Sequence, residues 1–352
     1  MIRNLTLSCC TLFVLVSGSA QDIHFTLYDM MPLAFNPAES GAFSGTYRLS
    51  ALYRDQWLSV TGVPNEYKTP SLSVDVPVVK GLRDNDWVGV GVLLYADKSG
   101  SLGLSQTAFK LSAAYHFALD KKGNNILSLG YQTGSIQRKL NATGLTSASS
   151  DPNNKNPDLL EDDTGLLSEL ESSYTDHVGG LHLKALVNRE DILQLGVSVG
   201  HLGRSMGGLR SMGGGATDTL GPTGNYNIPK RILAHGSYRT MMNDRLAIVP
   251  SAFVQILGQD SEIVGQVVGE YLFNAEKQVI LKGGIGYRVG DAVQLILGAD
   301  IRELKITVGY DVNVSRLSPA SNTFGAIELS ATIIGIIYKK PDPDPVLFCP
   351  RF

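Results

Sequence analysis

The C-terminal part of the chain is built from segments in which apolar and polar side chains alternate. The pattern is clearest from Val279 to Ile333, where four such segments follow one another. Leu295, Val308 and Leu329 are among the alternating apolar residues. Because successive side chains of a strand point to opposite faces, each segment is predicted to be a strand with one apolar and one polar face.

The length and the charges of these segments distinguish a membrane barrel from a soluble sandwich. Each segment runs for about 9 to 12 residues, close to what a tilted strand needs to cross a bilayer. A dry core would not accept unpaired charges, whereas the polar interior of a barrel does. The pattern therefore predicts an all-β fold, a transmembrane up-and-down antiparallel β-barrel. The mid-strand charges on the polar face are Lys282, Asp300, Lys305, Asp311 and Glu328.

The composition supports a membrane barrel. Of the 352 residues only 18% are charged, and 38 are glycine. Beyond the N-terminus no apolar run reaches about 18 residues, the length that a transmembrane helix requires. The net charge of −3 argues against a nucleic-acid-binding surface, so nucleic acid is not expected as a partner.

The first 20 residues are predicted to be a signal peptide. Arg3 supplies a positive end, residues 5–16 are apolar, and small residues precede Gln21. Cleavage after residue 20 would leave one cysteine, Cys349, so no disulfide framework is expected. Export together with the barrel pattern predicts a Gram-negative outer membrane as the location.

The mature chain divides into three parts. Residues 21–45 contain prolines and no alternation, and are expected to lie in the periplasm or to plug the barrel. Residues 46–338 are predicted to form the barrel, and the proline-rich tail 339–352 cannot continue a strand and is expected in the periplasm. The predicted strands are 46–57, 68–78, 87–97, 104–118, 125–137, 173–187, 191–202, 229–240, 245–257, 261–274, 277–289, 292–301, 303–315 and 324–338.

The connections between these fourteen strands are asymmetric. If both chain ends lie in the periplasm, the connections on that side are short. The two longest, 138–172 and 203–228, then fall on the opposite side. Short periplasmic turns, long extracellular loops and an even strand number are typical of single-chain bacterial barrels.

The sequence contains no motif that indicates catalysis or a metal site. It has no metal-binding His-x-x-His or Cys-x-x-Cys spacing and no Gly-x-Ser-x-Gly elbow of a hydrolase. The acidic stretch 151–171 lacks the register of a calcium-binding EF-hand loop and is interpreted as a solvated loop. We therefore expect neither enzyme activity, nor a cofactor, nor a metal.

Two segments are candidates for binding partners. The glycine-rich loop repeats Arg-Ser-Met-Gly-Gly, and its methionines and arginines make it adaptable. The tail ends in apolar residues that a purely solvated end would not favour, so it is interpreted as a docking peptide. The candidate residues are Arg204, Met206, Arg210 and Met212 in the loop, and Phe348, Cys349, Pro350, Arg351 and Phe352 in the tail.

Several short stretches, taken in their order and spacing, have a counterpart in a known family. They include residues 21–28, 36–38, 53–57, 69–75, 89–100, 310–321 and 349–352. Their motif residues are Asn36, Pro37, Arg54, Gln56 and Trp57. Over essentially the whole mature chain the sequence resembles the PorP/SprF family of the type IX secretion system.

The resemblance implies an outer-membrane barrel of Bacteroidetes, without enzyme activity, that serves protein secretion and in some species gliding motility. It implies as partners a secreted surface cargo with a type B C-terminal domain and periplasmic or lipoprotein components of the secretion system, besides outer-membrane lipid. The outer loops would hold the cargo at the cell surface, and the tail and the N-terminal segment would meet the periplasmic components.

Two other functions fit the same pattern. An outer-membrane solute uptake channel of the fatty-acid-transporter type also has fourteen strands and an N-terminal plug, but its lumen must be wide enough to pass solute. The inward charges of this chain are mixed in sign, so they could pair and close the lumen. A barrel that only positions a lipoprotein is the third alternative.

Overall fold

The computed structural model describes residues 23–56, 67–81, 83, 85–99, 104–141, 169–188, 190–203, 210–211, 228–315 and 323–337. The predicted signal peptide, the tail 339–352 and most of the two longest loops lie outside these residues.

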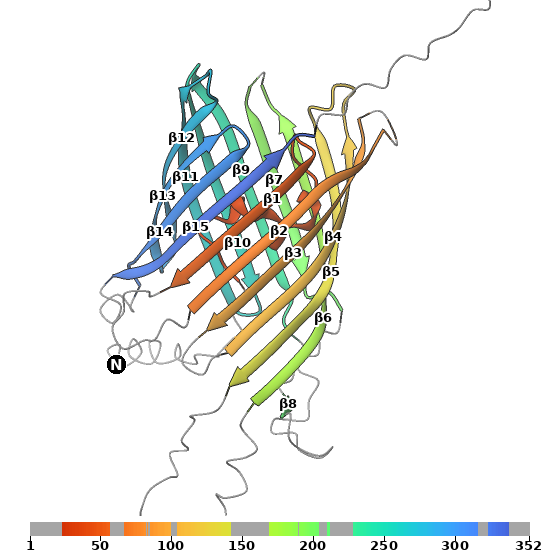
Figure 1. Cartoon of the computed structure of the whole chain (residues 1–352), viewed down its shortest axis with the longest axis vertical. Coiled ribbons are helices and arrows are strands. Elements are labelled where there is room, and N and C mark those ends of the chain that lie inside the picture. Colours follow the sequence, from red (N-terminus) through yellow and green to blue (C-terminus); the bar gives the residue numbers. More distant parts are fainter. Residues whose placement is uncertain are drawn as a thin grey trace, which may run out of the picture.

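Fourteen strands form one closed antiparallel barrel, as the alternation predicts. Neighbours in the ring are neighbours along the chain, and β1 closes the ring by pairing with β15 (Figure 1). The strands of the ring are β1 (Tyr47–Gln56), β2 (Tyr67–Lys80), β3 (Trp87–Ser99), β4 (Leu104–Ala118), β5 (Ile126–Asn141), β6 (Glu169–Leu186), β7 (Ile192–Gly200), β9 (Arg231–Asn243), β10 (Leu246–Leu257), β11 (Asp260–Asn274), β12 (Val279–Arg288), β13 (Ala292–Ile301), β14 (Leu304–Asn313) and β15 (Phe324–Gly335).

The structure differs from the predicted strands mainly around β5 and β6. Both strands continue further toward their shared loop than the sequence pattern indicates. Close to these ends the outward residues are hydroxyl-bearing rather than apolar, among them Ser135, Ser173 and Thr175, so the alternation fades before the strands end. A two-residue strand that the sequence did not predict, β8 (Arg210–Ser211), pairs with the end of β6 outside the ring.

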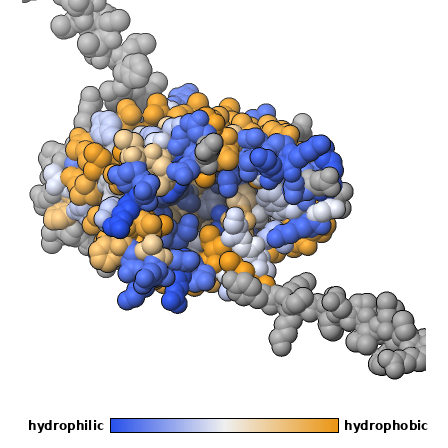
Figure 2. Space-filling view, turned by 90° about the horizontal axis from the view of Figure 1, so that it is seen from above, coloured by the Kyte–Doolittle hydropathy of each residue, from blue (hydrophilic) through white to orange (hydrophobic). Residues whose placement is uncertain are grey.

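The two faces of the wall lie as predicted. Leu295, Val308 and Leu329 point outward and are 45%, 38% and 53% exposed, whereas Asp311 and Glu328 point inward and are almost fully buried. An end-on view shows hydrophobic residues around the outside and hydrophilic residues around a central hollow (Figure 2). The outer face is thus suited to lipid and the inner face to polar contacts.

The two ends of the barrel differ. At one end, here called the short-turn end, the strands are joined by connections such as 244–245, 275–278 and 302–303. The opposite end, the long-loop end, carries the connections 142–168 and 201–230. In an outer-membrane barrel the short turns face the periplasm.

Residues 23–44, here called the luminal segment, run inside the barrel (Figure 1). The segment starts beside the strand ends of the long-loop end, where His24 lies with Leu257 and Asp291, and it leads into β1 at the short-turn end. It contains three short 3₁₀ helices, η1 (Tyr28–Met30), η2 (Pro32–Ala34) and η3 (Pro37–Glu39). None of the helices among the described residues is long and apolar enough to cross a membrane.

The luminal segment adds an apolar core that the strand pattern did not predict. Phe25, Leu27 and Met31 are almost fully buried and belong to a cluster with the inward side chains Leu93 and Phe253. Phe253 stacks edge-on against Phe35 with ring centroids 5.2 Å apart. The inner face therefore carries both apolar and polar side chains, because it contacts a segment that has both, and not only water.

A charge on the outward face tests the assignment of the two faces. We expect Leu295→Arg, in the middle of β13, to lower the free energy of unfolding by about 2–4 kcal/mol, since the arginine would face the bilayer midplane. Ile301→Arg, at the end of the same strand and equally outward, should cost about 0–1 kcal/mol. Urea titration of the barrel in lipid vesicles measures both. Equal costs at the two positions would contradict the lipid-facing assignment.

Candidate functional site

Thr26 attaches the luminal segment to the wall near the long-loop end. The carboxylate of Glu328 accepts hydrogen bonds from the backbone N–H groups of Thr26 and Leu27, both at 2.8 Å. The Thr26 hydroxyl donates to Asp311 at 2.5 Å, and its carbonyl accepts from the side-chain amide of Gln266 at 2.8 Å. Every polar group of this fully buried threonine is therefore bonded to a strand of the barrel.

Two arginines hold the carboxylates of this attachment point. Arg54 contacts Glu328 and also Asp311, the latter at 3.5 Å. Arg288 contacts Asp311 at 2.9 Å, so the two arginines share one carboxylate. These side chains are almost fully buried, and breaking a buried ion pair leaves an uncompensated charge. The carboxylates that hold the segment are therefore the same ones that pair with the arginines of the wall.

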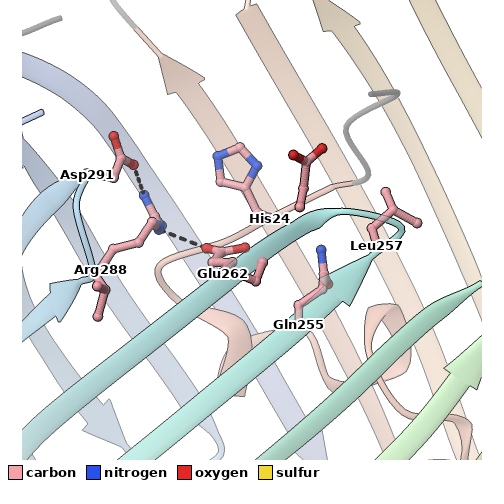
Figure 3. A pocket seen from close by; sticks show the side chains of 9 residues that line it. His24, Gln255, Leu257, Glu262, Arg288 and Asp291 are labelled. Atoms are coloured by element: carbon pink, nitrogen blue, oxygen red, sulfur yellow. Dashed lines mark hydrogen bonds and ion pairs between the residues drawn. The ribbon is translucent and has the colours of Figure 1, made fainter. Parts of the chain in front are cut away.

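A pocket of about 210 Å³ opens beside this network at the long-loop end (Figure 3). Arg288 lines it and pairs with Glu262 at 2.8 Å and with Asp291 at 3.2 Å. Gln255, 7% exposed, also lines it, and among the described residues its Oε1 has no hydrogen-bond partner. The lining of the pocket thus sets three carboxylates, those of Asp260, Glu262 and Asp291, against Arg288 and His24. A pocket with this surplus of acceptors favours a cationic or hydrogen-bond-donating group.

Asn36 anchors the middle of the luminal segment. Its side-chain amide donates to the backbone carbonyl of Leu181 at 2.9 Å, and its Oδ1 accepts from the N–H of Ala38 at 3.0 Å, which caps η3. The wall is bare of side chains here. A Cβ on Gly180 would overlap the side chain of Asn36, and a Cβ on Gly130 would overlap the backbone of Ala38. The segment and the wall can approach this closely only because these inward positions are glycine.

The segment is attached a third time toward the short-turn end. Asp75 accepts from the backbone N–H of Gly41 at 2.7 Å and pairs with Arg48 at 2.8 Å. The ring of His116 donates to the carbonyl of Ser40 at 2.8 Å. The luminal segment is therefore bonded to the wall at three levels along the bore.

A cavity of about 340 Å³ lies inside the barrel next to the segment, lined by charges of both signs. Lys282 pairs with Asp300 at 2.9 Å and lies 3.6 Å from Glu270, which also pairs with Arg239 at 2.8 Å. The inward charges of mixed sign therefore pair with one another here, as the sequence indicated. Among the described residues no group of three or more His, Cys, Asp or Glu is placed to hold a metal ion.

Three of the motif residues that the sequence singled out lie at the attachment points. Asn36 and Pro37 meet the glycine-lined wall, and Arg54 belongs to the ion-pair network. Gln56 lines a small pocket with Ile23 at the long-loop end. Arg210 lies in β8, but its side chain is outside the description. The other candidates lie outside the described residues: Trp57, Arg204, Met206, Met212, Phe348, Cys349, Pro350, Arg351 and Phe352.

The sequence reasoning missed Thr26 and the glycines that receive Asn36. A threonine in an irregular segment carries no local signal. The inward glycines did carry one, because a glycine inside a strand often marks a close approach of another backbone, and Gly130 and Gly180 stand at inward positions of β5 and β6.

Comparison with known proteins gives one family match. The family model "Type IX secretion system membrane protein PorP/SprF" matches residues 17–333. No curated protein matches the chain.

Several solved structures resemble the chain at low identity. A FadL homologue of Pseudomonas aeruginosa is 13% identical with a TM-score of 0.47, over 85% of this chain and 92% of that chain. The toluene transporter TbuX of Ralstonia pickettii is 12% identical with a TM-score of 0.46, over 85% and 90%. The toluene transporter TodX of P. putida is 11% identical with a TM-score of 0.45, over 86% and 93%. Likeness at this level carries no conclusion about the function of this chain.

Substitutions of two neighbouring glycines, which lie on opposite faces of β6, test the contact between Asn36 and the wall. We expect Gly180→Ala to lower the free energy of unfolding by about 1–3 kcal/mol, since its methyl group overlaps the side chain of Asn36 and the segment must shift. Gly179→Ala is the matched control, because an outward methyl there meets only Leu202, at 3.4 Å. Urea titration in lipid vesicles measures both variants. Equal stability of the two would show that the luminal segment does not press against this wall.

Proposed function

Because the chain belongs to the PorP/SprF family of type IX secretion system membrane proteins, we propose that it anchors or supports the export of a secreted surface protein. In this proposal the barrel is a non-enzymatic docking platform in the outer membrane. The cargo carries a type B C-terminal domain, binds at the long-loop end, and takes part in gliding motility where the species glides. The tail and the short-turn end meet periplasmic or lipoprotein components of the secretion system.

The observation that carries this proposal is the occupied lumen. The luminal segment extends along the bore, is bonded to the wall at three levels, and forms a buried apolar core with inward side chains. A conduit for a protein or a large solute would need this segment to leave. Leaving would remove the hydrogen bonds that the segment donates to the buried carboxylates of Glu328, Asp311 and Asp75, which is costly.

The long-loop end supplies the features that a secreted partner would bind. The acceptor-rich pocket beside Arg288 suits a lysine or arginine side chain of the partner. The two longest connections of the chain, 142–168 and 201–230, leave the barrel at the same end. Partner binding at this end therefore needs no movement of the luminal segment.

Affinity capture from outer membranes tests the proposed partners. We expect a barrel with an affinity tag in the 275–278 turn to recover both secretion-system components and a large surface protein. Removal of residues 339–352 should lose the periplasmic components and keep the surface protein, because the two contacts lie at opposite ends. Mass spectrometry of the captured proteins is the measurement. Recovery of neither class by the full-length barrel would contradict the proposal.

Conductance in planar bilayers separates a platform from an uptake channel. We expect the wild-type barrel to show little steady conductance, and Glu328→Ala to raise it several-fold, because this variant removes the acceptor of both Thr26 and Leu27. Glu303→Ala, in an exposed turn, is the control and should behave as wild type. Heat-dependent migration on gels confirms that each variant is a folded barrel. A large steady conductance of the wild type would favour the uptake channel.

A further inference from the structure

The outward face of β4, β5, β6 and β7 contains an open trough of about 730 Å³. Its lining is apolar except for one serine and the hydroxyls of two tyrosines. It extends from Val88 and Tyr115, near the short-turn end, to Val199 and Leu202, toward the long-loop end. The trough therefore follows the direction in which a lipid chain lies in the membrane.

Small residues on both faces of the wall create the trough. On the outer face, Ala113 and Gly179 stand where neighbouring positions carry leucine or tyrosine. On the inner face, Gly130 and Gly180 receive the luminal segment, and their backbone forms part of the trough floor. The wall is consequently a single layer of backbone here, with the segment on one side and an unfilled apolar surface on the other.

The short-turn end of the trough has a polar and basic border. The hydroxyl of Tyr115 donates to Asp86 at 3.0 Å, which directs this ring toward water. Two turns meet beside it, since Asn85 donates to the carbonyl of Lys121 at 2.9 Å and Arg83 donates to the carbonyl of Ala118 at 3.1 Å. These contacts place the β4–β5 turn with its lysines at the same edge of the trough as Arg83, which lies 3.7 Å from Asp86.

The charge of the β4–β5 turn differs from that of three other short turns. The β4–β5 turn exposes Lys121 and Lys122 side by side, while its acid, Asp120, is occupied by the backbone N–H of Asn125 at 2.7 Å. The β9–β10, β11–β12 and β13–β14 turns each carry one acid next to one base. These pairs are Asp244 and Arg245, Glu276 and Lys277, and Arg302 and Glu303. Of these four turns only the β4–β5 turn, which lies below the trough, carries more bases than acids.

We propose that the trough and its basic border bind one anionic phospholipid of the periplasmic leaflet. An acyl chain fills the trough along Leu129 and Leu181, and the phosphate lies against Lys121 and Lys122. The dimensions agree: Tyr115 is three residues from the end of β4, which at about 3.3 Å per residue puts the trough some 10 Å above the turn. That is the span of the glycerol and ester groups. The apolar groove suits the acyl chain of such a lipid, and the cations at the membrane border suit its phosphate.

Filling the trough is the first test. We expect Gly179→Leu to reduce the phospholipid retained by the purified barrel at least five-fold, measured by native mass spectrometry after exchange into detergent. Gly283→Leu is the matched control, because Gly283 also faces outward but has no atom near its Cβ position and lies away from the trough. Ala113→Leu provides a second variant from a different strand, should Gly179→Leu fail to fold.

Removing the charges is the second test. Delipidated barrel is mixed with vesicles of phosphatidylglycerol or of phosphatidylcholine with the same acyl chains. We expect the wild type to retain phosphatidylglycerol preferentially, and the double variant Lys121→Gln, Lys122→Gln to lose most of this preference. The double variant Lys277→Gln, Arg302→Gln, which removes two cations from other short turns, should keep it.

Each outcome decides the proposal. Loss of retention in Gly179→Leu together with loss of preference in the lysine variant supports it. Equal retention by Gly179→Leu and Gly283→Leu would mean ordinary boundary lipid only, and would overturn the site. A membrane protein that copurifies in place of lipid and is lost in Gly179→Leu would also overturn it, since the trough would then be a protein interface.

Discussion

Glu328 accepts two backbone hydrogen bonds from the luminal segment and at the same time pairs with Arg54. This interaction joins the two parts of the molecule that the rest of the structure depends on. The wall carries carboxylates that point into a confined lumen, where each needs a hydrogen-bond or ion-pair partner. The luminal segment carries backbone N–H groups that are not bonded within a helix or a strand. Each part satisfies polar groups of the other, so the segment is held inside the barrel by hydrogen bonds to the wall.

The same segment determines the shape of the wall. Asn36 and Pro37 approach the backbone of β5 and β6 because Gly130 and Gly180 leave no side chain between them. Close approach on the inside coincides with a trough on the outside. A barrel of this construction presents bindable surface at its rim and on its membrane face, while its bore is occupied. That arrangement supports the proposed role of a platform that holds partners over that of a pore that passes them.

The fold could be predicted from the sequence because a strand that separates lipid from a polar lumen must alternate apolar and polar side chains. The strands that contain Leu295 and Leu329 do so. The ends of β5 and β6 could not be predicted as well. Near them the outward residues, such as Ser173 and Thr175, are polar, so apolar and polar side chains no longer alternate. Arg54 could be singled out through the family resemblance, but its partner Glu328 lies 274 residues away, and only the closed ring brings the two together. Thr26 had no signal, because its role depends on tertiary contacts alone.

Hydrogen–deuterium exchange in the folded barrel tests whether the wall holds the luminal segment in place. The amides of Thr26, Leu27 and Gly41 donate to buried carboxylates of the wall. We expect peptides covering these residues to exchange as slowly as those of the strands β14 and β15. Exchange at the rate of an unfolded peptide, in a barrel whose strands remain protected, would contradict it.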